Sequence, residues 1–142
     1  YLLKEDYKTM TINLASILPQ DNKYIFDFSI GNQDSEEVAE IDLEYELMLR
    51  TTTNLPLIYE LYMNEQYTDE GATNIIVENT TNYDEYGTYF RTMTTEKVIL
   101  PYTEGKTNLY QLVITFPANY NEEIYQDIIE LLEITVNAEQ VT

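Results

Sequence analysis

The sequence of 142 residues contains no cysteine and no histidine. Without cysteine, disulfides, thiolate zinc sites and cysteine nucleophiles are excluded. Without histidine, the chain lacks the commonest general base and the commonest metal ligand. The remaining residues form no recognisable catalytic constellation. The sequence therefore argues against an enzyme.

Basic residues are also scarce, with 7 Lys and Arg against 26 Asp and Glu and a formal net charge of -19. Binding to phosphate or to an anionic membrane needs a basic surface, so we expect no nucleic-acid partner and no such membrane surface. No hydrophobic run approaches the length that spans a membrane. The acidity instead predicts solubility, repulsion between copies at low salt, and affinity for cations.

Glycine and proline number only 4 each, whereas tyrosine occurs 14 times and threonine is frequent. Hydrophobic residues make up 44% of the chain, which is too many for a disordered tail. Tyrosine, threonine and the β-branched residues suit a pleated, half-buried surface. The length fits one domain with a core of its own.

The rest of the chain is organised around residues 41–50, which alternate with a period of two. Such alternation predicts a long strand with one face in a core and the other in water. The expected inward residues are Ile41, Leu43, Tyr45, Leu47 and Leu49.

Similar but shorter patterns occur along the chain, separated by turn-like polar segments. About nine strands, with turn signals every 8–12 residues or so, predict an all-β, antiparallel two-sheet sandwich. Residues 79–87 are expected to form a polar loop, and residues 121–126 at most a short helical turn. The other expected strands lie at 8–14, 23–30, 59–63, 75–77, 89–93, 97–102, 109–116 and 132–139.

Three stretches together resemble the TasA/camelysin family of exported biofilm-matrix fibre proteins. Residues 11–21 resemble that family's early strand with its Pro-Gly-Asp turn, although Gln20 stands where the family favours glycine. Residues 26–32 resemble the next strand, and residues 132–140 resemble the closing I-T-V-x-A-x-Q strand. Residues 54–105 do not align. The peptidase activity attached to camelysin has no support here, because the chain has no HExxH motif.

The resemblance implies a jelly-roll-like sandwich, exported through a cleaved leader and assembled into fibres on the cell surface or in a biofilm matrix. A start at Tyr1 rather than methionine fits a removed leader. We therefore expect a secreted protein, extracellular or on the cell surface, whose partners are copies of itself in a head-to-tail homopolymer. In such fibres an N-terminal segment of one subunit completes the sheet of the next.

That segment is expected within residues 1–14, with a single sandwich domain at 15–142. A donor strand adds to an exposed sheet edge through backbone hydrogen bonds, and its alternate side chains fill pockets. The alternative is an ordinary first strand of the same sandwich. The candidate donor-strand residues are Tyr1, Leu2, Leu3, Tyr7, Met10, Ile12 and Leu14.

A second candidate surface is an interaction loop containing Tyr83, Tyr86 and Tyr89, since tyrosine is favoured at interfaces. The alternative is simple packing of these rings over a sheet edge. Such a platform would also suit a monomeric cell-surface adhesin or carbohydrate-binding sandwich. Asn79 begins a formal glycosylation sequence, for which an unmodified loop is the favoured interpretation.

Acidic clusters recur in the expected turns, and none has the spacing of a calcium-binding EF-hand loop. We interpret them as solvated turns and expect no cofactor or metal; calcium at a loop or subunit junction is the alternative. The clusters are Asp34 with Glu36 and Glu37, Asp69 with Glu70, Asp84 with Glu85, and Glu122 with Glu123.

Overall fold

The computed structural model describes residues 7–13, 23–31, 33–34, 37–38, 42–52, 57–83, 89–101, 105–117 and 131–140. Within these ranges the chain forms strands and no helix, so none of them holds a helix that could cross a membrane. The strands are β1 (Tyr7–Asn13), β2 (Lys23–Gly31), β3 (Gln33–Asp34), β4 (Glu37–Val38), β5 (Leu43–Thr52), β6 (Ile58–Met63), β7 (Ile76–Tyr83), β8 (Tyr89–Thr95), β9 (Val98–Leu100), β10 (Thr107–Thr115) and β11 (Leu131–Gln140).

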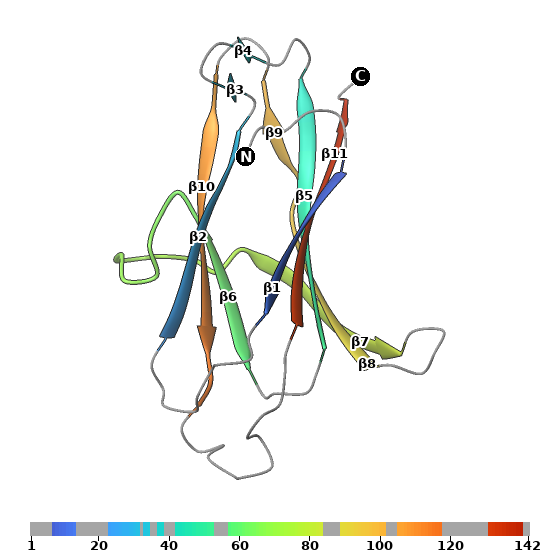
Figure 1. Cartoon of the computed structure of the whole chain (residues 1–142). Helices are drawn as coiled ribbons and strands as arrows, with labels where there is room; N and C mark the ends of the chain where they lie inside the picture. Colours follow the sequence, from blue (N-terminus) through green and yellow to red (C-terminus); the bar gives the residue numbers. More distant parts are fainter. Residues whose placement is uncertain are drawn as a thin grey trace.

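The strands form two sheets that face each other (Figure 1). The larger sheet has six strands in the order β1-β11-β5-β8-β7, with β9 also paired to β5. The smaller sheet has the order β2-β10-β6, and β3 with β4 makes a separate two-stranded piece. Every pairing is antiparallel, which confirms the predicted sandwich.

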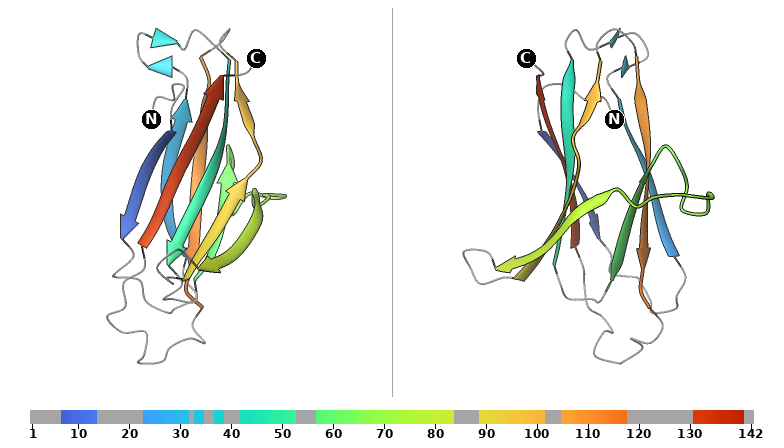
Figure 2. Two further views of the ribbon diagram at one scale, coloured as in Figure 1. Left: turned by 90° about the vertical axis from the view of Figure 1, so that its right-hand side faces the viewer. Right: turned by 180° about the vertical axis from the view of Figure 1, so that it is seen from behind.

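The order of the strands is jelly-roll-like. Along the chain, β1, β2, β5, β6, β8, β10 and β11 alternate between the larger and the smaller sheet (Figure 2). β7 follows a chain segment that lies against the smaller sheet, where the Ile75 amide donates to the Leu61 carbonyl at 2.8 Å. β7 then pairs with β8 of the larger sheet, so the chain crosses between sheets at this point.

β5 is the central strand that the sequence predicted. It pairs with β11 along one edge and with β8 and β9 along the other. Its inward side chains are almost completely buried, and the side chains between them are half-buried or exposed. Ile41 lies outside the described residues. The core residues on β5 are Leu43, Tyr45, Leu47 and Leu49.

The facing strands complete the core as the alternation predicted. On β10 the inward residues Tyr110, Leu112 and Ile114 are buried, and on β11 Leu132, Ile134 and Val136 are buried. The two sheets also meet through a polar contact. The Tyr45 and Tyr110 hydroxyls lie 2.5 Å apart, and the Asn108 amide donates to the Tyr45 oxygen at 2.8 Å.

The sequence-based prediction was wrong about residues 79–83, which belong to strand β7 rather than to a polar loop. Their side chains are exposed on both faces, so no apolar alternation marks the strand. β3 and β4 are also additional to the predicted strands, because two-residue strands are too short to carry a period. The predicted helical turn at 121–126 lies outside the described residues.

Candidate functional site

The predicted donor segment contains β1, which forms one edge of the larger sheet of its own chain. β1 pairs with β11 over its full length, from Tyr7 opposite Asn137 to Asn13 opposite Leu131. Among the described strands it has no second partner. Tyr1, Leu2, Leu3 and Leu14 lie outside the described residues, so they stay predictions.

The partners of β1 on β11 belong to the core. Met10 stands opposite Ile134 and Ile12 opposite Leu132, and both partners are buried. β1 therefore separates the backbone edge of a core strand from solvent. Among the described strands, the pairing with β11 alone joins β1 to its sheet.

Two of the three candidate tyrosines, Tyr83 and Tyr89, belong to strands at the far edge of the same sheet. Tyr83 ends β7 and is 72% exposed, and its register partner is Tyr89 at the start of β8. Tyr86 lies between them, outside the described residues. The structure thus brings Tyr83 and Tyr89 opposite each other across two paired strands.

These two strands form a ribbon (β7 and β8) that extends away from the sandwich (Figure 2). Every residue from Val77 to Tyr83 is exposed. The inner strand of the ribbon, β8, pairs with β5 from Phe90 opposite Thr52 to Thr94 opposite Met48, and the Arg50 guanidinium lies 4.1 Å from the centre of the Phe90 ring. The ribbon is therefore fixed along β8, and its outer strand, β7, is open to solvent.

The sequence did not predict a covered outer face on the smaller sheet. Residues 64–75, here called the strap, fold across β10 and β6. Asn64 starts the strap with a φ of 58° and joins β10 twice, because its amide donates to the Leu109 carbonyl at 2.7 Å and its side-chain oxygen accepts from the Leu109 amide at 2.9 Å. Asparagine tolerates this left-handed backbone better than most residues do.

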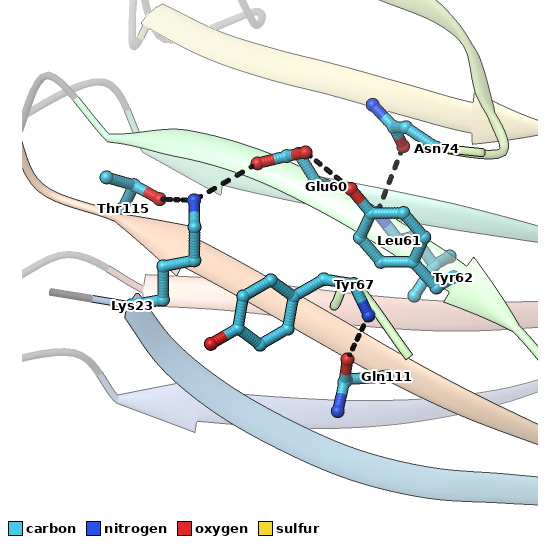
Figure 3. A network of polar contacts seen from close by, with 8 residues as sticks. All are labelled: Lys23, Glu60, Leu61, Tyr62, Tyr67, Asn74, Gln111 and Thr115. Carbon is cyan, nitrogen blue, oxygen red and sulfur yellow. Dashed lines mark hydrogen bonds and ion pairs between the residues drawn. The ribbon is translucent and has the colours of Figure 1, made fainter. Parts of the chain in front are cut away.

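Tyr67 of the strap lies beside Lys23 and Gln111 (Figure 3). Its amide donates to the Gln111 side-chain oxygen at 2.8 Å, and its ring lies 5.7 Å from the Lys23 ammonium. Val113, which projects from the outer face of β10, is 0% exposed. The strap and its neighbours therefore seal the middle of this face.

A polar group on the same face joins all three strands of the smaller sheet (Figure 3). The Lys23 ammonium on β2 donates to Thr115 on β10 at 3.2 Å and lies 3.7 Å from the Glu60 carboxylate on β6. The Tyr62 hydroxyl donates to the other Glu60 oxygen at 2.6 Å. Burial and the adjacent Glu60 carboxylate raise the pKa of Tyr62 to about 12.

The strap also closes the free edge of β6. The Asn74 side-chain oxygen accepts from the Leu61 amide at 3.0 Å, and the Leu61 carbonyl accepts from Ile75. Both backbone groups of Leu61 are therefore satisfied without a neighbouring strand. Residues 64–72 are polar, which is typical of a turn. Nothing else in the sequence indicated that this segment would protect the edge of β6.

Beside the strap lies an open groove of about 770 Å³. Two of its carboxylates hold the strap together, because Glu65 accepts from the Thr73 amide and Asp69 from the Gln66 amide, both at 2.7 Å. No group of three acidic side chains in the described part of the chain is arranged to hold a metal ion. The groove can bind a ligand through hydrogen bonds and its apolar part. It is lined by Asp27, Phe28, Ser29, Asn64, Glu65, Gln66, Asp69, Leu109, Tyr110 and Gln111.

Comparisons with protein-family models, with curated proteins and with solved structures find no match for this chain. The class of protein is therefore defined by the fold alone, an antiparallel jelly-roll-like sandwich whose larger sheet ends, among the described strands, in β1 on one side and β7 on the other.

Proposed function

We propose that this protein is a structural subunit of an extracellular filament, either of a biofilm matrix or of a pilus-like fibre. Copies assemble head to tail when residues 1–14 of one subunit add as a strand to the next. The single observation that carries the proposal is the position of β1, an edge strand held by β11 alone among the described strands.

Exchange of this strand needs no new kind of contact. A donated β1 can repeat the antiparallel register on β11 of the next subunit, from Tyr7 opposite Asn137 onward. The hydrogen bonds lost within one chain are then regained between two chains. Because the donor and acceptor surfaces differ, the contact is heterologous, and repeating it gives an open filament unless the rotation closes a ring.

Charge controls the assembly in this proposal. Copies with a net charge of -19 repel each other unless ions screen or bridge them. Filaments should form more readily with added salt, with calcium, or at mildly acidic pH, where the negative charge of the chain begins to fall. Assembly that ignored all three conditions would mean that the acidic surface stays remote from the subunit contacts.

A disulfide experiment tests the proposal directly, since the natural chain has no cysteine. We would mix Tyr7→Cys protein with Asn137→Cys protein, assemble them, and oxidise gently. Directly paired residues in antiparallel strands are close enough to cross-link. Disulfides between the two chains in filaments, and none in the monomeric fraction at low salt, are the expected result.

The doubly substituted protein supplies the control. If filaments contain only disulfides within one chain of the Tyr7→Cys, Asn137→Cys variant, the donor-strand proposal is wrong. Deletion of residues 1–14 should in addition leave a soluble protein that does not polymerise. The same stretch added as a free peptide should restore its thermal stability by occupying the vacant edge.

The groove beside the strap favours a second candidate function, a cell-surface adhesin or carbohydrate-binding domain. Its volume of about 770 Å³ suits a small ligand, and it combines acids and amides with Leu109, which is 61% exposed. Calorimetric titration with soluble oligosaccharides tests this candidate. Binding that is lost in Asp27→Ala, but kept in the exposed ribbon variant Asn79→Ala, would support it.

A further inference from the structure

The outer strand of the ribbon, β7, is an edge with little of the usual protection over most of its length. Natural edge strands are commonly short, or carry lysine, proline or a bulge that prevents pairing with another protein. β7 has neither lysine nor proline in its eight residues. Its one irregularity lies between Ile76 and Glu78, which leaves residues 78–83 as a regular run.

No described strand covers this edge, since β7 pairs with β8 alone. Val77 is also 54% exposed. Thr80 and Thr81 are β-branched and favour extended backbone. The run from Glu78 to Tyr83 therefore combines an accessible backbone with residues that suit another paired strand.

Charge distinguishes the ribbon from the rest of the molecule and identifies its partner. The described strands of the ribbon contain one acid, Glu78, and one base, Arg91, whereas the whole chain has a net charge of -19. A basic partner would be drawn to the acidic surfaces elsewhere. A second copy of this chain is repelled by those surfaces and meets least repulsion here.

We propose that β7 pairs antiparallel with β7 of a second copy, about a two-fold axis at the middle of the strand. This contact is isologous, unlike head-to-tail strand addition, and it does not depend on residues 1–14. In a filament it would join neighbouring filaments side by side. In unassembled protein it would give a dimer with one continuous sheet.

The antiparallel direction follows from the charges. A parallel pairing would set the two Glu78 side chains close together. In the antiparallel pairing about the middle of the strand, Glu78 lies opposite Thr81, so the two Glu78 residues are three positions apart along the strands. Three positions span roughly 10 Å, which exceeds the screening length of about 8 Å at physiological salt.

Single cysteines on the edge test the proposal without background, because the natural chain has none. Asn79→Cys, Thr80→Cys and Thr81→Cys would be oxidised gently in the full-length protein, singly and in pairwise mixtures. A mixture of two variants detects a register in which a β7 residue lies opposite a different residue of the second chain, rather than opposite the same residue. We expect disulfide-linked dimers to form several-fold faster for at least one combination than for Leu109→Cys, an exposed position on β10.

Two further measurements separate the outcomes. The additional substitution of Thr81 or Thr80 by lysine, a natural edge-protecting residue, should slow the cross-link in the remaining cysteine variants. Rates equal to the Leu109→Cys control would overturn the proposal. Preferential cross-linking of the β7 cysteines to Tyr7→Cys protein would overturn it too, by showing that the donor strand occupies this edge.

These results are independent of filament formation. Dimers linked through β7 in a protein that makes no filaments would contradict the proposed function and leave this inference intact. Filaments with cross-links between Tyr7→Cys and Asn137→Cys, but none through β7, would support the proposed function and contradict the pairing of β7 with β7.

Discussion

β5 and β7 belong to the same sheet, and both pair with β8, yet their surroundings are opposite. β5 has partners along both edges and one face in the core, whereas β7 has one described partner and no buried residue. A strand between two neighbours stabilises the fold. A strand at the margin contributes little to stability and leaves its backbone accessible, so assembly surfaces are expected at the margins of this sandwich.

The largest difference between the two strands should appear on truncation of one apolar side chain in each. Leu47→Ala on β5 removes a completely buried side chain and should lower the free energy of unfolding by about 2–5 kcal/mol. Val77→Ala on β7 should change it by no more than about 0.5 kcal/mol, because Val77 is exposed. Urea denaturation measures both.

Glu46→Gln is the matched control on β5, since Glu46 lies on the opposite face from Leu47 and is half-buried. It should have little effect. Similar small losses for Leu47→Ala and Glu46→Gln would show that the inward face of β5 has been assigned incorrectly.

The same contrast explains what could be predicted from the sequence. In β5 one face meets the core, so Leu43, Tyr45, Leu47 and Leu49 mark it by their alternation. In β7 both faces meet water, so polar residues follow one another without a period, and residues 79–83 were predicted as a loop. The sequence did not predict that the strap covers the outer face of the smaller sheet. That arrangement depends on a contact between Tyr67 and Gln111, which lie far apart in the sequence.

The second largest effect should come from the polar contact between the sheets. Tyr45→Phe removes a hydroxyl that bonds both Tyr110 and Asn108 in the core, and should cost about 1–3 kcal/mol. Tyr110→Phe leaves the bond between Asn108 and Tyr45 in place and should cost less. If the two variants had equal stability in urea, the three groups would not act as one network.

A smaller effect is expected at the protected edge of β6. Asn74→Ala removes the side-chain oxygen that accepts from the Leu61 and Ile76 amides, and should cost about 1 kcal/mol. It should also speed hydrogen exchange at the Leu61 amide. Asn79→Ala on the unprotected β7 is the control, with no change expected at Leu61; unchanged exchange in Asn74→Ala would mean that Asn74 does not protect β6.

The smallest effect at neutral pH is expected from Tyr62→Phe, which becomes informative in alkali. The pKa of Tyr62 is raised from 10.0 to about 12, so the folded protein keeps a proton that the unfolded chain loses in this range. Stability should therefore be highest below pH 10 and fall as pH rises through about 12. Burial also raises the pKa values of Tyr45 and Tyr110, which adds to the fall.

Urea denaturation at a series of alkaline pH values measures this slope. Tyr62→Phe should make the slope shallower, whereas Tyr83→Phe on the exposed ribbon should leave it unchanged. A slope that is the same in both variants would mean that Tyr62 does not contribute to it.

The register of β1 on β11 has a consequence for the time course of folding. Tyr7 pairs with Asn137, so nearly the whole chain must be present before this edge of the sheet can close. Contacts between such distant residues form slowly, because a long loop must be ordered first. β11 can pair with β5 before its own β1 arrives. In the proposed assembly, the β1 of a nearby copy would compete for the same edge during that interval, so crowding at the moment of folding would favour exchange over self-closure.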